Sequence, residues 1–237
     1  MNKIELRGLK KSIKGHPVLD IGYLQFVKGR LCTLIGPNGA SKTTLLKSIC
    51  GLVHVDQGAI LFDDKTVSQM NHYRSLSKIG TLFASTDSLS KLTVQELFEE
   101  HFHYYGLKYT DSWQTLLDQV NLKVSLDTNF DKMSLGMKQR VQLALALAHL
   151  PEILLLDEPF NGLDPDGIKL IKNKLKSLEK EKIIIIASHT LSDLEDISTD
   201  SVFMSNGKTS EIKALDEIRR TYQDGIAGYY DELTHLN

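Results

Sequence analysis

Two uninterrupted apolar runs stand out in the second half of the chain. Residues 153–156 read Ile-Leu-Leu-Leu, and residues 183–187 read Ile-Ile-Ile-Ile-Ala. A third run near the N-terminus, residues 31–35, has the same character. Short continuous apolar runs are typical of strands that are buried on both faces of a parallel sheet. The pattern therefore predicts an α/β fold with a mainly parallel sheet.

Helical patterns dominate between residues 89 and 132. Thr93, followed three residues later by Glu96, forms a capping box and predicts a helix that ends near Gly106. Four apolar residues of this helix would share one face: Leu97, Phe98, Phe102 and Tyr105.

A further helix is predicted to begin after Ser134, because serine is a good N-cap. Pro151 would end this helix. Its apolar residues would fall on one face: Met137, Val141, Leu145 and Ala148. Helices are also predicted for residues 166–180 and 191–198.

Turn residues divide the N-terminal region into strands. Residues 3–35 are predicted to form short alternating strands with a turn at Gly15-His16-Pro17. Residues 58–67 are predicted to form a hairpin that bends at Asp63-Asp64. Asn206-Gly207 marks another hairpin turn near the C-terminus.

The segment after the N-terminal apolar run, residues 31–35, has the composition of a phosphate-binding loop. It reads Gly36-Pro37-Asn38-Gly39-Ala40-Ser41-Lys42-Thr43-Thr44 and leads into a predicted helix. Backbone N–H groups of such a loop point inward, and with the positive end of the helix they can hold an anion. Lys42 would reach the β- and γ-phosphates, and the Thr43 hydroxyl would bind Mg²⁺. An ordinary glycine turn would explain the glycines but not Lys42 and Thr43.

Ser41 departs from the usual pattern of this loop because it replaces the second glycine. We expect Ser41 to adopt helical dihedral angles at the helix start, where its backbone N–H stays available. Nucleotide binding should then survive with a small change in loop packing.

Polar residues directly follow both late apolar runs. Asp157-Glu158 ends the first run, and Ser188-His189 ends the second. In an open α/β sheet, ligands bind at the carboxyl ends of the strands. Asp157 would hold Mg²⁺ through water, and Glu158 would polarise the attacking water as general base. His189 would bond the γ-phosphate and orient that water.

Composition narrows the class of protein. The chain has 237 residues and a net charge of −2 with acidic and basic residues interspersed, so no basic field favours nucleic acid. Cys32 and Cys50 are predicted to be buried free thiols in a reducing compartment. No apolar stretch approaches the roughly 20 residues that span a bilayer, and no signal peptide opens the sequence.

Five motifs, taken in order, resemble the ATP-binding subunit of an ABC transporter. They are the phosphate loop, the signature-like Ser134-Leu135-Gly136-Met137-Lys138-Gln139, Asp157-Glu158, the D-loop-like Asn161-Gly162-Leu163-Asp164-Pro165, and His189. The resemblance implies a P-loop NTPase core and two subunits packed head to tail. Each ATP would lie between the phosphate loop of one subunit and the signature of the other. Ser134 and Gly136 would therefore serve the γ-phosphate bound by the partner subunit.

Three positions depart from the pattern of this family. Ala84 stands where the Q-loop usually carries Gln, so Mg²⁺ would be retained chiefly by Thr43 and Asp157. Ile13 takes the place of the aromatic residue that stacks on adenine, so base contacts should be apolar and weakly selective. Leu135 replaces the first signature glycine, which resembles exporters of the bacitracin- and bacteriocin-resistance type.

These patterns predict a single ABC ATP-binding domain over residues 1–237. Residues 1–88 and 136–222 would form the core with an N-terminal antiparallel β subdomain. Residues 89–135 would form an inserted helical subdomain, and residues 223–237 a C-terminal extension. Because this tail contains no motif, we expect it to lie on the surface.

The predicted function is ATP binding and hydrolysis, with ATP and Mg²⁺ held by a homodimer or by two paired ATP-binding subunits. Hydrolysis would energise a separate integral membrane permease, so the chain would lie in the cytoplasm on the inner face of the cell membrane. Two alternatives remain open. One is a regulatory module in which ATP binding acts as a conformational switch, and the other is a soluble ATPase without a membrane partner.

Overall fold

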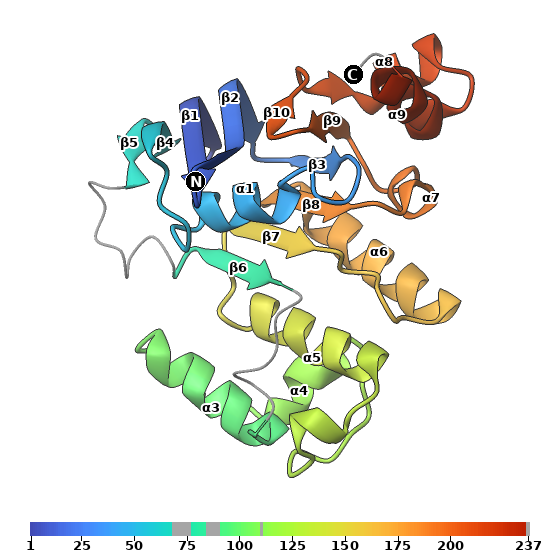
Figure 1. Cartoon of the computed structure of the whole chain (residues 1–237). Helices are drawn as coiled ribbons and strands as arrows, with labels where there is room; N and C mark the ends of the chain where they lie inside the picture. Colours follow the sequence, from blue (N-terminus) through green and yellow to red (C-terminus); the bar gives the residue numbers. More distant parts are fainter. Residues whose placement is uncertain (68–76, 84–90, 110, 236–237) are drawn as a thin grey trace.

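The computed structural model describes residues 1–67, 77–83, 91–109 and 111–235. These residues form two β-sheets, a helical lobe at the bottom of the view in Figure 1, and a pair of C-terminal helices at the top. Within this part of the chain, no helix is both long and apolar enough to cross a membrane. Both cysteines are buried free thiols, as predicted.

The N-terminal strands form an antiparallel sheet in the order β2–β1–β4–β5. Its strands are β1 (Lys3–Ile13), β2 (His16–Val27), β4 (Gln57–Phe62) and β5 (Lys65–Thr66). The predicted hairpin in residues 58–67 is confirmed, because β4 pairs with β5 around Asp63-Asp64. The first two strands are longer than expected, since β1 and β2 pair along nearly their whole length.

The β1–β2 turn corrects the turn that we predict at residues 15–17. Ile13 pairs with His16, so the loop is Lys14-Gly15, with φ angles of 50° and 81°. Two-residue hairpin loops of this type need a positive φ at both positions, and proline cannot supply one. Pro17 instead lies in β2, which is an edge strand and tolerates it.

The larger sheet is mainly parallel, as predicted, and has the order β10–β9–β3–β8–β7–β6, with β11 also paired to β9. Its strands are β3 (Arg30–Ile35), β6 (Ile79–Leu82), β7 (Ile153–Asp157), β8 (Ile183–Ser188), β9 (Asp200–Ser205), β10 (Lys208–Thr209) and β11 (Lys213–Ala214). β10 and β11 are short and antiparallel to β9, and the β9–β10 pairing confirms the predicted hairpin turn. The three apolar runs are the adjacent central strands β3, β8 and β7.

Successive side chains of the central strands enter two different cores. Ile183 and Ile185 pack in the core that the antiparallel sheet and α1 (Lys42–Ile49) share. Ile184 and Ile186 pack in the core that contains the other helices, including α6 (Pro165–Glu179). Because both faces of the sheet are covered, its central strands show no polar alternation.

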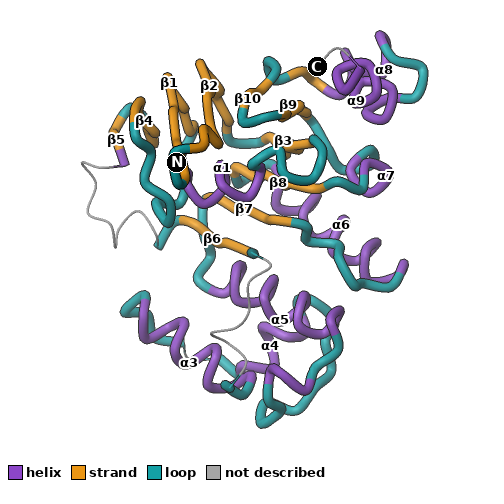
Figure 2. The backbone as a smooth tube through the Cα atoms, viewed as in Figure 1, coloured by secondary structure: helices purple, strands orange, loops and turns teal. Residues whose placement is uncertain are grey.

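The helices α3 (Val94–Tyr104), α4 (Trp113–Asp118) and α5 (Leu135–Ala148) form the helical lobe (Figure 2). The lobe also contains a 3₁₀ turn (Phe130–Lys132). Thr93 and Glu96 cap α3 reciprocally, as expected. The single apolar face predicted for α5 is wrong, because residues 141–144 and 146–148 are all buried. Within the lobe, α3 and α4 pack against α5, and β6 of the larger sheet also contacts α5.

The C-terminal tail is not a surface extension, which corrects the prediction. It forms α9 (Gly225–His235), whose Ile226 and Tyr229 are fully buried. The Tyr229 hydroxyl lies 2.9 Å from the Ser210 hydroxyl. Tyr230 and Leu233 pack against the same core. This i, i+3, i+4, i+7 spacing is a helical pattern that marks the tail as part of the core. The remaining helices are α7 (Leu191–Leu194), shorter than predicted, and α8 (Leu215–Thr221).

Candidate functional site

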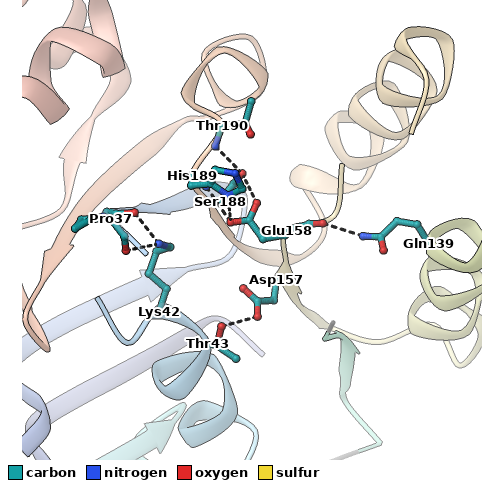
Figure 3. A network of polar contacts seen from close by, with 10 residues as sticks. Pro37, Lys42, Thr43, Gln139, Asp157, Glu158, Ser188, His189 and Thr190 are labelled. Atoms are coloured by element: carbon teal, nitrogen blue, oxygen red, sulfur yellow. Dashed lines mark hydrogen bonds and ion pairs between the residues drawn. The ribbon is translucent and has the colours of Figure 1, made fainter. Parts of the chain in front are cut away.

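Five polar side chains gather where β3, β7 and β8 end (Figure 3). They form what we call the sheet-edge cluster: Lys42, Thr43, Asp157, Glu158 and His189. β8 pairs in parallel with β3 on one side and β7 on the other. The residues that follow these strands therefore meet at one edge, although they are far apart in the sequence.

Ser41 corrects the geometry that we predict for the loop between β3 and α1. Its φ is 76° and its ψ is 22°, which is left-handed rather than helical. This region is disfavoured by roughly 1–2 kcal/mol for a residue with a Cβ, a cost that glycine does not incur. The observed geometry thus explains why the motif usually has glycine at this position. The helix still begins here, because the Ser41 carbonyl accepts a hydrogen bond from Leu45 N.

Lys42 places a cation inside the phosphate loop. Its Nζ donates to the carbonyl oxygens of Gly36 and Pro37, at 2.6 and 3.0 Å. Burial lowers the pKa of Lys42, while the charges of Asp157 and Glu158 oppose that shift. Within the described residues, no carboxylate forms an ion pair with this ammonium group. A buried cation held only by carbonyl dipoles is well suited to bind an anion.

Thr43 and Asp157 present two oxygen ligands side by side. The Thr43 hydroxyl donates to Asp157 Oδ2 at 2.6 Å. Asp157 is buried, and burial raises its pKa, against which the Thr43 hydrogen bond acts. Mg²⁺ prefers oxygen ligands and binds through few of them from the protein, with the rest from water and phosphate. The donor set therefore fits Mg²⁺.

Glu158 is held by the residues that end β8. Its carboxylate accepts hydrogen bonds from Ser188 Oγ at 2.8 Å and from His189 N at 3.0 Å, and it contacts His189 Nδ1 at 2.6 Å. The Glu158 side chain is 19% exposed and the His189 side chain 47%. Both groups can therefore meet a ligand that arrives from solvent.

The signature residues begin at the N-cap of α5. The Ser134 side chain caps the helix by accepting from Met137 N at 3.3 Å, as predicted. Leu135 is 62% exposed. We call residues 134–136 the signature end. In the described part of the chain, no hydrogen bond or ion pair joins it to residues 36–44.

The other signature residues face their own subunit. Lys138 Nζ lies 5.7 Å above the ring of Phe130. The Gln139 amide donates to the backbone oxygen of Glu158 at 2.9 Å. Asp164 caps α6 and pairs with Arg140 of α5 at 3.1 Å.

The structure also adds residues that the motifs do not single out. Ser188 donates a hydrogen bond to the Glu158 carboxylate, and its position beside His189 at the end of a strand is the sequence signal for this contact.

Ile13, expected near adenine, is 43% exposed at the end of β1. Ala84 lies outside the described residues.

Sequence comparison identifies the family. The family described as ABC transporter matches residues 20–161, which is more than half of the chain. The chain therefore belongs to the ABC transporter family, and its domain is an ATP-binding domain with ATP hydrolase activity, as the motifs predict.

Two relatives are named for antibiotic transport. The lantibiotic transport ATP-binding protein SrtF of Streptococcus pyogenes is 36% identical over 211 residues, which cover 86% of this chain and 88% of that protein. The bacitracin transport ATP-binding protein BcrA of Bacillus licheniformis is 34% identical over 220 residues, which cover 92% and 71%. They confirm the predicted likeness to ATP-binding proteins of the bacitracin type.

Solved structures confirm the fold. An ATP-binding subunit of an ABC transporter superposes with a TM-score of 0.81 and 28% identity over 92% of both chains. A dimeric ATP-binding cassette, in a post-hydrolysis state bound to ADP and Pi, superposes with a TM-score of 0.80 over 90% of this chain and 98% of that one. At 22% identity, the second likeness shows the fold alone. The α/β fold with a P-loop NTPase core is therefore confirmed.

Proposed function

We propose that two ATP-binding subunits share their nucleotide sites, and that Mg²⁺-dependent ATP hydrolysis at these sites drives a separate membrane permease. The observation that carries this proposal is the contrast between the sheet-edge cluster and the exposed signature end of the same chain. The cluster offers a cation, two oxygen ligands and a base, whereas the signature end has no bond to it.

The phosphate loop would hold the triphosphate. Residues 36–44 would offer their backbone N–H groups to the phosphate oxygens at the positive end of α1. Lys42 would exchange its two carbonyl partners for the β- and γ-phosphates, since an anion compensates a buried ammonium better than carbonyl dipoles do. Thr43 and Asp157 would hold Mg²⁺, which neutralises charge on the phosphate oxygens.

Glu158 would accept a proton from the water that attacks the γ-phosphorus. Its carboxylate now contacts Ser188 and His189, so it would exchange at least one of these contacts for that water. His189 would then be free to donate to the γ-phosphate. The 2.6 Å distance between the two side chains supports this proposal, because both groups can then reach the same ligand.

The signature and D-loop would act on the partner subunit's nucleotide. Ser134, Leu135 and Gly136 would approach its γ-phosphate at the start of α5, where backbone N–H groups point outward. Met137, Lys138 and Gln139 continue this motif, and Asp164 would lie at the dimer interface. A cassette of the same fold is described as dimeric, and exposure of the signature end supports the same assembly here.

The permease would be an integral membrane protein on a separate chain, and this subunit would lie in the cytoplasm on the inner face of the membrane. The names of the two relatives support a transport role, since both are transport ATP-binding proteins.

The test is Glu158→Gln in the purified chain. ATP affinity should be retained, because the phosphate loop is unchanged, and hydrolysis should fall about 10²-fold or more, the usual worth of a positioned base. Glu181→Gln, at an exposed turn after α6, is the control. We expect the Glu158 variant to elute as an ATP-bound dimer in gel filtration. Unchanged steady-state hydrolysis would remove Glu158 from this role.

A further inference from the structure

The backbone of Glu158 is left-handed, which is unusual for a residue that carries a side chain. Its φ is 51°. The following residue is Pro159, and a residue before proline strongly favours extended geometry with negative φ. Non-glycine residues stay in sparsely populated regions only where the surrounding structure holds them there, and such residues gather at functional sites.

Several contacts hold Glu158 in this geometry. Its N–H donates to Ala187 O at 2.8 Å, and its carbonyl oxygen accepts from Asn161 N at 3.2 Å. These bonds come from the neighbouring strand and from the turn itself. The carbonyl oxygen accepts a further bond, from Gln139 Nε2 at 2.9 Å. Among the described residues, Gln139 is the one hydrogen-bond partner of Glu158 from the helical lobe (Figure 3).

Gln139 belongs to the signature motif but does not face outward with it. The residue is 8% exposed, whereas Leu135, one turn earlier on α5, is 62% exposed. Its amide therefore binds the Glu158 backbone of its own subunit. A direct role at the partner's nucleotide does not fit this burial.

The start of α5 is also fixed to the D-loop. A Cβ added to Gly136 would lie 2.6 Å from the Gly162 carbonyl oxygen, so the two segments are in close contact. Arg140 Nη2 donates to Asp164 Oδ1 at 3.1 Å. The signature end, the D-loop and the Glu158 backbone therefore form one connected unit.

We propose that Gln139 is a positioning residue for Glu158. Its amide holds the strained Glu158 backbone so that the carboxylate is aimed at the attacking water. Through α5, it links the base of one ATP site to the signature end that serves the other site. This inference rests on the proposed role of Glu158 as base.

The test is a double-mutant cycle between Gln139→Met and Glu158→Gln. Methionine keeps the length and volume of the side chain but cannot donate a hydrogen bond. We expect Gln139→Met to lower kcat about 10-fold, the effect of losing one hydrogen bond to a buried carbonyl, with KM for ATP changed less than about 2-fold. Gln142→Met, the same change almost one turn later on α5, is the matched control and should keep parent kcat.

The cycle separates positioning from direct contact with nucleotide. If Gln139 acts through Glu158, adding Gln139→Met to Glu158→Gln should lower the residual rate less than about 2-fold. The double variant should also form the ATP-bound dimer at the same ATP concentration as Glu158→Gln alone. A full multiplicative loss, or loss of the dimer, would overturn the inference while leaving the role of Glu158 intact. If Glu158→Gln alone keeps parent activity, the proposed function fails instead.

A crystal structure of nucleotide-free Gln139→Met gives a second readout that does not depend on activity. We expect the φ of Glu158 to leave the left-handed region, or its carboxylate to lose the Ser188 or His189 contact. An unchanged φ with all three carboxylate contacts retained would contradict a positioning role.

Discussion

The sheet-edge cluster and the signature end belong to the same proposed reaction, yet the chain builds them in opposite ways. The polar groups of the cluster bond to one another or to nearby backbone, as Lys42, Thr43 and Glu158 illustrate. Among the described residues, the hydrogen bonds of the signature end lie within the first turn of α5, and its Ser134 and Leu135 are exposed. The cluster therefore resembles a complete recognition site, whereas the signature end resembles one part of a site whose other part lies on a second subunit.

Burial explains why the two regions should respond differently to substitution. Lys42 and Asp157 are buried, and burial disfavours the charged form of each, as their pKa shifts indicate. A bound anion or cation compensates such charges strongly in this environment. In the proposed reaction, the signature end would act through backbone N–H groups at the surface. Its contribution should depend on whether a second subunit is present.

The largest effect should come from Lys42→Ala, which breaks the cluster. ATP hydrolysis should fall about 10³-fold, since a buried donor to the phosphates is lost. Fluorescence titration with a labelled ATP should show weaker binding even at concentrations where the chain is monomeric. Lys47→Ala on the same helix is the control, because Lys47 Nζ lies over the Phe83 ring and not in the loop. Equal ATP affinity in both variants would contradict the role of Lys42.

A second effect should separate the two regions. Ser134→Arg should leave ATP binding to the monomer unchanged, because Ser134 has no bond to the phosphate loop. Hydrolysis should fall about 10²-fold, because the partner's site loses its donors and meets a bulky side chain. Ser134→Asn, which keeps an N-cap, controls for loss of helix stability. Weakened ATP binding by the Ser134→Arg monomer would place this residue in its own site.

A smaller effect is expected where the helical lobe contacts the larger sheet. His101 Nε2 on α3 lies 3.0 Å from His149 Nδ1 at the end of α5, and His149 Nε2 contacts the Ile79 carbonyl of β6. Burial, with a smaller effect from His149, lowers the pKa of His101 to about 3, and burial also lowers the pKa of His149. The folded state therefore binds a proton at His101 less tightly than the unfolded state.

The sign of the pH dependence follows from this shift. The stability contributed by neutral His101 should be complete above pH 6.5, the ordinary pKa, and should be lost as the pH falls towards 3. The loss should approach about 1.4 kcal/mol per pH unit within that window. The free energy of unfolding, measured with urea at several pH values between 6.5 and 4, should change less steeply with pH for His101→Gln than for the parent. His103→Gln, at an exposed position on the same helix, should keep the parent slope, and equal slopes in all three proteins would contradict the assignment.

Local sequence patterns were sufficient to predict the parallel strands and the sheet-edge cluster. The apolar runs of β3, β7 and β8 and the polar residues after them are contiguous in the sequence. Because parallel strands end at one edge, their order alone brings Lys42, Asp157 and His189 together. The Thr93–Glu96 capping box and the cap at Ser134 are likewise local, and both are confirmed.

The features that could not be predicted from the sequence depend on backbone geometry or on contacts between residues far apart in the chain. The left-handed backbones of Ser41 and Glu158 are set by the structure around them, since residue type alone favours other geometry. The contact between His101 and His149 joins residues that are 48 positions apart. The apolar residues of α9 have helical spacing in the sequence. The structure is needed to show that they pack against the core of the domain.

The most direct test of the account is complementation between two inactive chains. Lys42→Ala lacks a working phosphate loop, and Ser134→Arg lacks a working signature end, so each alone should be inactive. In a mixed dimer, one shared site keeps both its phosphate loop and its signature. We predict that mixing the two variants restores hydrolysis well above the sum of the separate rates, while Lys42→Ala mixed with the Lys42→Ala/Ser134→Arg double variant does not. A mixture that stays at that sum, or full activity from a demonstrably monomeric parent chain, would contradict shared sites.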